Sequence, residues 1–87
     1  MDASYKTIII QVMKHKMEEK DLKDDMVLMS DLKFDSLTFV SMIVLLESTY
    51  GFSFDDEYIS VEKLKTVKDV GDYVNFKIAQ VNIDGNK

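Results

Sequence analysis

The sequence predicts an all-α fold: a four-helix bundle with three long helices and a short third helix. The composition favours helices, because the 87 residues include no proline and only three glycines. Apolar residues also recur at three- and four-residue spacing in separate segments, which is typical of helices with one buried face. A chain of this length makes one domain, so we expect a single unit over residues 1–87, with a core at about 4–81 and a frayed tail at 82–87.

The first helix is expected over residues 5–20. Ser4 can cap its N-terminus, and the apolar residues of the segment fall on one helical face. His15, the only histidine, lies off that face, so we expect its side chain to be exposed and structurally neutral. The next segment, residues 21–34, is rich in aspartate but contains too many apolar side chains for a disordered linker. We therefore expect an ordered loop packed over the core.

The second helix is expected from Ser36 to Tyr50, with Gly51 in the usual glycine position after a helix C-terminus. Its core face is formed by Phe39, Met42, Ile43, Leu46 and Tyr50. A second apolar group on the same helix consists of Leu37, Val40 and Val44. This second group favours a surface for another protein, although a central helix buried on two sides would show the same pattern.

The third helix is expected to be short and to begin at the acidic residues 55–57. The side chains that should point from it into the core are Tyr58, Ile59, Val61 and Leu64. Thr66 and Asp69 predict a capping box at the start of the fourth helix. The buried face of that helix is expected to contain Val67, Val70, Tyr73 or Val74, Ile78 and Val81.

The charge distribution limits the classes of partner. The net charge is −5, and no basic residue lies between Lys33 and Lys63. This acidic middle segment argues against nucleic acid as a partner and favours a protein with a basic surface. The alternative is that the acidic residues form a solvated face that only keeps the domain soluble. The longest strictly apolar run, residues 42–46, is too short to span a bilayer. We therefore expect no membrane insertion and a cytoplasmic location.

The residue types also limit the chemistry. The absence of cysteine rules out disulfides, thiolate metal sites and thiol nucleophiles, and one histidine cannot form a histidine metal site by itself. The aspartate-rich stretches lack the full twelve-residue calcium loop with its central glycine. With no convergent acid–base pair either, we expect neither an enzyme nor a metal-binding protein.

The tripeptide Asp35-Ser36-Leu37 is the strongest candidate for a functional site. A serine preceded by a carboxylate at the start of a helix is well placed to carry a phosphate ester. A phosphate on this hydroxyl would lie in the positive field of the helix N-terminus. The sequence therefore predicts a carrier whose working group is attached to Ser36 after synthesis.

With these residues in place, the chain resembles the acyl carrier protein family over nearly its whole length. The resemblance rests on residues 31–37 as the attachment motif, residues 40–50 as the second helix, and Asp56-Glu57 followed by residues 64–67. It implies that a phosphopantetheinyl transferase attaches 4′-phosphopantetheine to Ser36, with Asp35 and Leu37 beside it. The thiol of this group would then carry acyl groups as thioesters for partner enzymes of lipid or specialised-metabolite biosynthesis.

The resemblance also implies a docking surface and a space for the acyl chain. The partners would be acyl-loading, acyl-transfer or condensing enzymes with basic docking surfaces, and we expect the carrier itself to be a monomer. The apolar docking residues would be Leu37, Val40 and Val44, and the acidic ones Glu47, Asp55, Asp56 and Glu57. The acyl chain would enter between the second and third helices, against Phe39, Ile43, Leu46, Phe54, Ile59 and Leu64.

The chain departs from the family pattern at several positions. Lys33 replaces the usual glycine before the attachment triplet, where a positive φ would cost a lysine about 1 kcal/mol or more. The segment before Thr66 is longer than usual, which predicts a longer third helix. Helix two also lacks acids at three positions where the family usually has them: Thr38, Ser41 and Ser48. This difference favours a specialised carrier. Two alternatives stay open: a stand-alone peptidyl carrier with aminoacyl cargo, and an unmodified helical interaction module.

Overall fold

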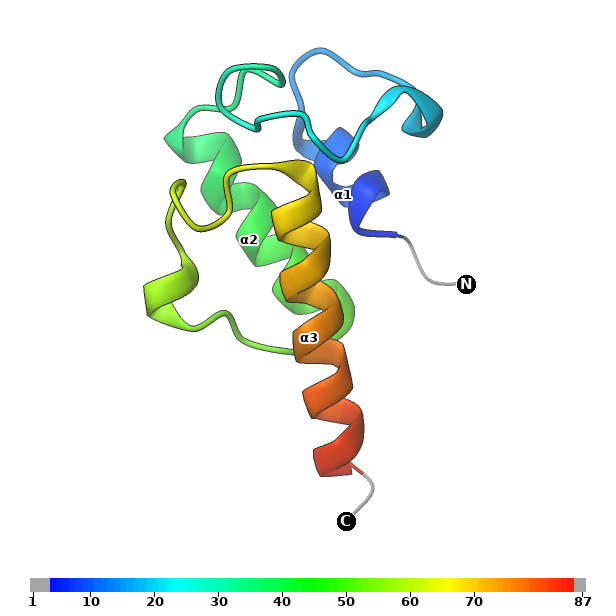
Figure 1. Ribbon diagram of the computed structural model, residues 1–87, viewed down its shortest axis with the longest axis vertical. Coiled ribbons are helices and arrows are strands. Elements are labelled where there is room, and N and C mark those ends of the chain that lie inside the picture. Colours follow the sequence, from blue (N-terminus) through cyan, green and yellow to red (C-terminus); the bar gives the residue numbers. More distant parts are fainter. Residues whose placement is uncertain (1–3, 86–87) are drawn as a thin grey trace.

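The structure, a computed structural model, describes the backbone of residues 4–85 and the side chains of residues 4–80. Its α-helices are α1 (Tyr5–Val12), α2 (Ser36–Tyr50) and α3 (Val67–Gly85), and α1 packs against both of the others (Figure 1). Two short 3₁₀ helices, η1 (Glu19–Asp21) and η2 (Asp56–Tyr58), lie in the connections. The all-α fold is confirmed, with three α-helices rather than four in the described part of the chain.

Helix α1 begins as predicted but ends early. The Ser4 hydroxyl accepts a hydrogen bond from the Thr7 N–H at 3.2 Å, which confirms the predicted cap. The helix ends at Val12 instead of continuing to residue 20, because Met13 turns into an extended conformation and is buried. The Lys16 ammonium donates to the carbonyl oxygens of residues 10 and 11 (3.2 and 2.6 Å), so the last turn keeps hydrogen-bond partners.

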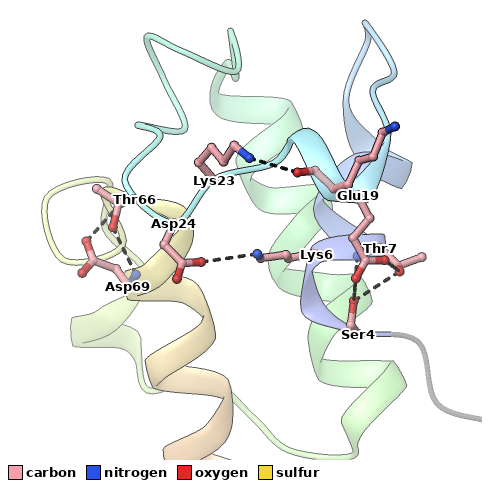
Figure 2. Close-up of polar contacts among 9 residues, drawn as sticks. Ser4, Lys6, Thr7, Glu19, Lys23, Asp24, Thr66 and Asp69 are labelled. Carbon is pink, nitrogen blue, oxygen red and sulfur yellow. Dashed lines mark hydrogen bonds and ion pairs between the residues drawn. The ribbon is translucent and has the colours of Figure 1, made fainter.

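The loop after η1 is ordered and packs over the core, as predicted. Asp24 of the loop lies between α1 and the start of α3, where its carboxylate pairs with Lys6 at 3.5 Å (Figure 2). Backbone hydrogen bonds join the loop to the start of α3: the Leu28 N–H donates to the Lys65 carbonyl at 2.9 Å, and the Val67 N–H to the Met26 carbonyl at 3.0 Å. The apolar side chains that the loop buries are Leu22, Leu28, Leu32 and Phe34.

Helix α2 has the predicted bounds. Gly51 follows it in the left-handed conformation (φ +73°), and its N–H donates to the Glu47 carbonyl at 2.9 Å. Glycine adopts this conformation without steric cost, so the helix ends there. The face predicted to enter the core is confirmed for the four residues that are buried: Phe39, Met42, Ile43 and Leu46.

The predicted short third helix is present only as the single 3₁₀ turn η2, and its expected extension is wrong. Only the single turn of η2 forms, and the chain from residue 59 to residue 66 contains turns instead of a helix. Without a repeating helical face, the side chains of this segment do not all enter the core. Leu64 is buried and Tyr58 is half-buried, but Ile59 and Val61 are 38% and 41% exposed.

Helix α3 begins with the predicted capping box. The Thr66 hydroxyl accepts from the Asp69 N–H at 3.1 Å, and the Asp69 carboxylate accepts from the Thr66 N–H at 3.0 Å (Figure 2). The helix continues to Gly85, past the point where we expected fraying, while residues 86–87 of that predicted tail lie outside the described residues. Within the described chain, no helix is long and apolar enough to cross a membrane.

Candidate functional site

Ser36 is the first residue of α2, and its side chain is exposed. Its position is fixed from the preceding loop, because Phe34 is buried and its N–H donates to the Leu28 carbonyl at 3.0 Å. The next residue, Asp35, is extended and caps the helix. The chain therefore passes from a buried ring to an exposed hydroxyl within two residues, with little freedom in between.

Both carboxylate oxygens of Asp35 have partners. Oδ1 accepts from the Thr38 N–H at 2.8 Å, and Oδ2 accepts from the Lys14 ammonium at 3.0 Å. The pKa of Asp35 lies well below its usual range. The hydrogen bond from the Thr38 N–H lowers it most, and the hydrogen bond from the Lys14 ammonium lowers it further. Asp35 is therefore ionised at neutral pH and in mild acid.

Lys33 has the left-handed backbone conformation that its place in the loop demands. Its φ is +59°, and it is the only non-glycine residue with positive φ among the described residues. An L-residue pays about 1–2 kcal/mol for this conformation. The turn directs the following Phe34 back into the core, so burial of that ring offsets the local strain.

The residues at the start of α2 fit a phosphate ester on Ser36. The exposed hydroxyl is open to a modifying enzyme, and the first amide N–H groups of a helix have no acceptors within the helix. The helix dipole also favours an anion at this end. One ammonium, that of Lys14, already lies beside the adjacent Asp35. A covalently attached phosphate therefore meets the positive end of the helix and one nearby ammonium, and also the negative charge of Asp35.

The second apolar group of α2 is exposed, so the alternative of a helix buried on two sides is wrong. Leu37, Val40 and Val44 are 75%, 51% and 55% exposed. They occupy the helix directly after Ser36, and we call them the α2 apolar patch. Exposed aliphatic side chains grouped on one helix are typical of a surface that contacts another molecule.

The four acidic residues predicted for docking divide into two pairs. Glu47 is half-buried, and its Oε2 accepts from the Phe54 N–H at 2.8 Å. The Asp55 carboxylate accepts from the Tyr73 hydroxyl at 3.0 Å and lies 3.6 Å from the Lys77 ammonium. These two acids hold the 52–55 segment to α2 and α3. Asp55 is nevertheless exposed, as are Asp56 and Glu57 in η2.

The residues predicted to line an acyl pocket are mostly ordinary core residues in this structure. Phe39, Ile43, Leu46, Phe54 and Leu64 are buried in one hydrophobic cluster, while Ile59 is partly exposed. A cavity of about 280 Å³ lies beside η2 and α3, and it shares only Leu64 with the predicted set. Its lining residues are Tyr58, Lys63, Leu64, Asp69, Asp72, Tyr73 and Phe76.

Two features of the site had no clear signal in the sequence. Lys14 belongs to a segment that the periodicity assigns to the first helix, and only the early end of α1 brings its ammonium to Asp35. The aromatic rings around the cavity are also brought together by the fold: the Tyr73 ring lies 4.8 Å from Phe54 and 4.9 Å from Tyr58 between centroids. Across the described residues, no three histidine, aspartate or glutamate side chains are placed to hold a metal ion.

Comparison with known proteins gives a consistent result. A protein family model described as a phosphopantetheine attachment site matches residues 6–74. An acyl carrier protein of Thermosynechococcus vestitus is 49% identical over 49 residues, which is 56% of this chain and 58% of that protein. An acyl carrier protein of Coprothermobacter proteolyticus is 39% identical over 57 residues, 66% of this chain and 67% of that protein. The alignment therefore spans little more than half the length of the first of these relatives.

The lowered pKa of Asp35 predicts a pH-dependent effect of Asp35→Asn. Asparagine also caps helices, so this change removes the charge and keeps the cap. The ionised carboxylate stabilises the fold above its ordinary pKa, about 4, and this stabilisation is lost as the pH falls toward the lower folded-state pKa. The variant should be less stable at neutral pH, and the difference should shrink in acid. Urea denaturation over a pH series measures it, and a constant difference would contradict the prediction.

The contact between Glu47 and Phe54 predicts different effects on stability for two substitutions that both remove the charge of Glu47. Glu47→Ala leaves the Phe54 N–H without its acceptor and should lower the free energy of unfolding by about 1–2 kcal/mol. Glu47→Gln keeps an acceptor oxygen and should lower it by less than about 0.5 kcal/mol. Both variants lose the same charge, so equal destabilisation in urea denaturation would show that Glu47 acts through its charge instead of this hydrogen bond.

Proposed function

This chain belongs to the acyl carrier protein family, and we propose that it carries acyl groups as thioesters on a 4′-phosphopantetheine arm attached to Ser36. Family membership identifies the cofactor as covalently bound 4′-phosphopantetheine and the protein as a carrier rather than an enzyme. When bound, this group supplies the thiol that a chain without cysteine lacks. The observation that carries the assignment to Ser36 is its exposed hydroxyl at the first residue of α2, inside the matched segment.

The chain's own residues prepare Ser36 for modification. In the transferase reaction, the Ser36 oxygen would attack the phosphorus atom that bears the pantetheine of coenzyme A. The pyrophosphate P–O bond would break, adenosine 3′,5′-bisphosphate would leave, and the hydroxyl proton would pass to a base of the transferase. Asp35 holds the first turn of α2 through the Thr38 N–H, so the hydroxyl is presented from a rigid turn. Its ionised carboxylate also provides an oxygen that could help the transferase orient magnesium and the hydroxyl.

The α2 apolar patch is our proposed docking surface, together with the exposed acids Asp56 and Glu57. Its position after Ser36 would place a partner enzyme over the attached arm. Exposed ion pairs are worth only about 0–1 kcal/mol each, which suits a carrier that must leave each partner quickly. The partners would be the transferase and acyl-loading, acyl-transfer or condensing enzymes with basic surfaces, in the cytoplasm.

The cargo is proposed to be an acyl group, with an aminoacyl group as the alternative. A packed hydrophobic cluster next to α2 supports acyl cargo, because an aliphatic chain can replace core contacts among apolar side chains. Five of the six residues proposed to meet the chain lie in this cluster: Phe39, Ile43, Leu46, Phe54 and Leu64. The five methionines in or against this cluster favour such repacking, because the unbranched thioether adapts its shape at low cost.

The intact mass tests the attachment. After incubation with coenzyme A, magnesium and a broad-specificity phosphopantetheinyl transferase, the protein should gain one phosphopantetheine, and Ser36→Ala should gain none. Loading the modified protein with acyl and aminoacyl donors then separates the two cargoes. No gain in a folded, previously unmodified protein would favour an unmodified interaction module. Repeating the reaction with Lys33→Gly would show whether Lys33 only demands a dedicated transferase.

The rate of the same reaction tests the docking surface. Val44→Ser removes an exposed apolar side chain of the α2 apolar patch, and Val61→Ser removes a comparably exposed one outside it. Burial of one valine against a partner is worth about 1.5 kcal/mol, so Val44→Ser should lower kcat/KM of the transferase by about tenfold. Val61→Ser should leave it nearly unchanged. Equal rates for the two variants would remove this patch from the transferase interface.

A further inference from the structure

Lys14 lies beside the proposed attachment site although it is distant in sequence. Its ammonium is 3.0 Å from Oδ2 of Asp35, the residue before Ser36. Both ends of this contact start from anchored backbone, because Met13 and Phe34, the residues before Lys14 and Asp35, are buried. The contact itself is exposed, with 68% and 49% of the two side chains accessible. A fixed backbone thus presents an exposed ammonium next to the start of α2.

The charges near Ser36 change when the arm is attached. A phosphodiester would add a second negative charge immediately after the ionised Asp35, and no basic residue occurs between Lys33 and Lys63 to offset it. Oδ1 of Asp35 is already bonded to the Thr38 N–H. Among the residues that the structure describes, Lys14 is the only one whose side chain forms an ion pair with Asp35. Two neighbouring anions would then share the Lys14 ammonium, and the other lysine close in sequence is the exposed Lys33, three residues before Ser36.

We propose that Lys14 is a positioning residue for the prosthetic arm, pairing with the phosphodiester on Ser36 once it is formed. This inference rests on the proposed function. An exposed lysine–aspartate pair is weak, so the ammonium can move from a position where it pairs only with Asp35 to one where it bridges both anions. The flexible lysine stem permits this movement while the backbone at Met13 stays in the core. Lys14 thereby ties the root of the arm to the end of α1 and orients it relative to the α2 apolar patch.

Competitive acetylation of lysines tests the proposal directly. The modified and unmodified proteins are labelled with a trace of acetic anhydride, and each lysine is quantified by mass spectrometry. Lys14 should react about threefold more slowly in the modified protein, an effect that one exposed ion pair can produce. Lys20 is a matched control, because it is also exposed and paired with a carboxylate, that of Glu18 at 3.3 Å. Equal labelling of Lys14 in the two forms would overturn the proposal.

The phosphorus-31 resonance of the modified protein provides a second readout. Lys14→Met should shift this resonance and remove its dependence on salt. Lys14→Arg should restore the parent's resonance position and its salt dependence, and Lys20→Met should match the parent in both. A purely structural role of Lys14 would not move the phosphorus signal in this pattern. If neither the parent nor Lys33→Gly gains mass, the proposed function fails and this inference fails with it. If the mass gain occurs and the Lys14→Met resonance is unchanged, this inference alone is overturned.

Discussion

The burial of the 22–34 loop against the core is the constraint on which the functional end of the molecule depends. Leu28 and Phe34 are buried from this loop, and the backbone of Leu28 is hydrogen-bonded to Lys65 just before α3. Burying two such side chains is worth several kcal/mol, roughly 3–6 on transfer scales, a large share of the stability of a domain of this size. The position of the α2 N-terminus therefore follows from the packing of the preceding loop and not from the serine itself.

This constraint explains why an energetically unfavourable backbone conformation is tolerated at Lys33, just before the site. Lys33 occupies the left-handed region so that Phe34 can turn inward and Asp35 outward. The result is an abrupt change from core to surface, and Ser36 is exposed at the first residue of a helix that packs one face into the core. Such an arrangement presents one hydroxyl on a rigid support while leaving the space around it open for a transferase and for the attached arm.

The acidic residues show how the fold divides similar side chains between structure and surface. Glu47 and Asp55 hold the 52–55 segment in place, the second through the Tyr73 hydroxyl, whose pKa is raised chiefly by burial and which therefore stays protonated as a donor. Asp56 and Glu57 remain exposed on the adjacent turn. Substitution of Asp56 or Glu57 would therefore leave the internal hydrogen bonds of Glu47 and Asp55 in place.

The sequence by itself determined the elements whose signals are local. The bounds of α2, its glycine stop, the capping box at Thr66 and the exposed Ser36 all follow from residues within one or two helical turns, where backbone geometry and capping chemistry act directly. Tertiary structure decided the rest. Helix α1 stops at Val12, where Met13 leaves the helix and is buried, and η2 is a single turn whose preceding residue, Asp55, is hydrogen-bonded to Tyr73 of α3. The same early stop places Lys14 at Asp35, a contact between distant segments that no local pattern encodes.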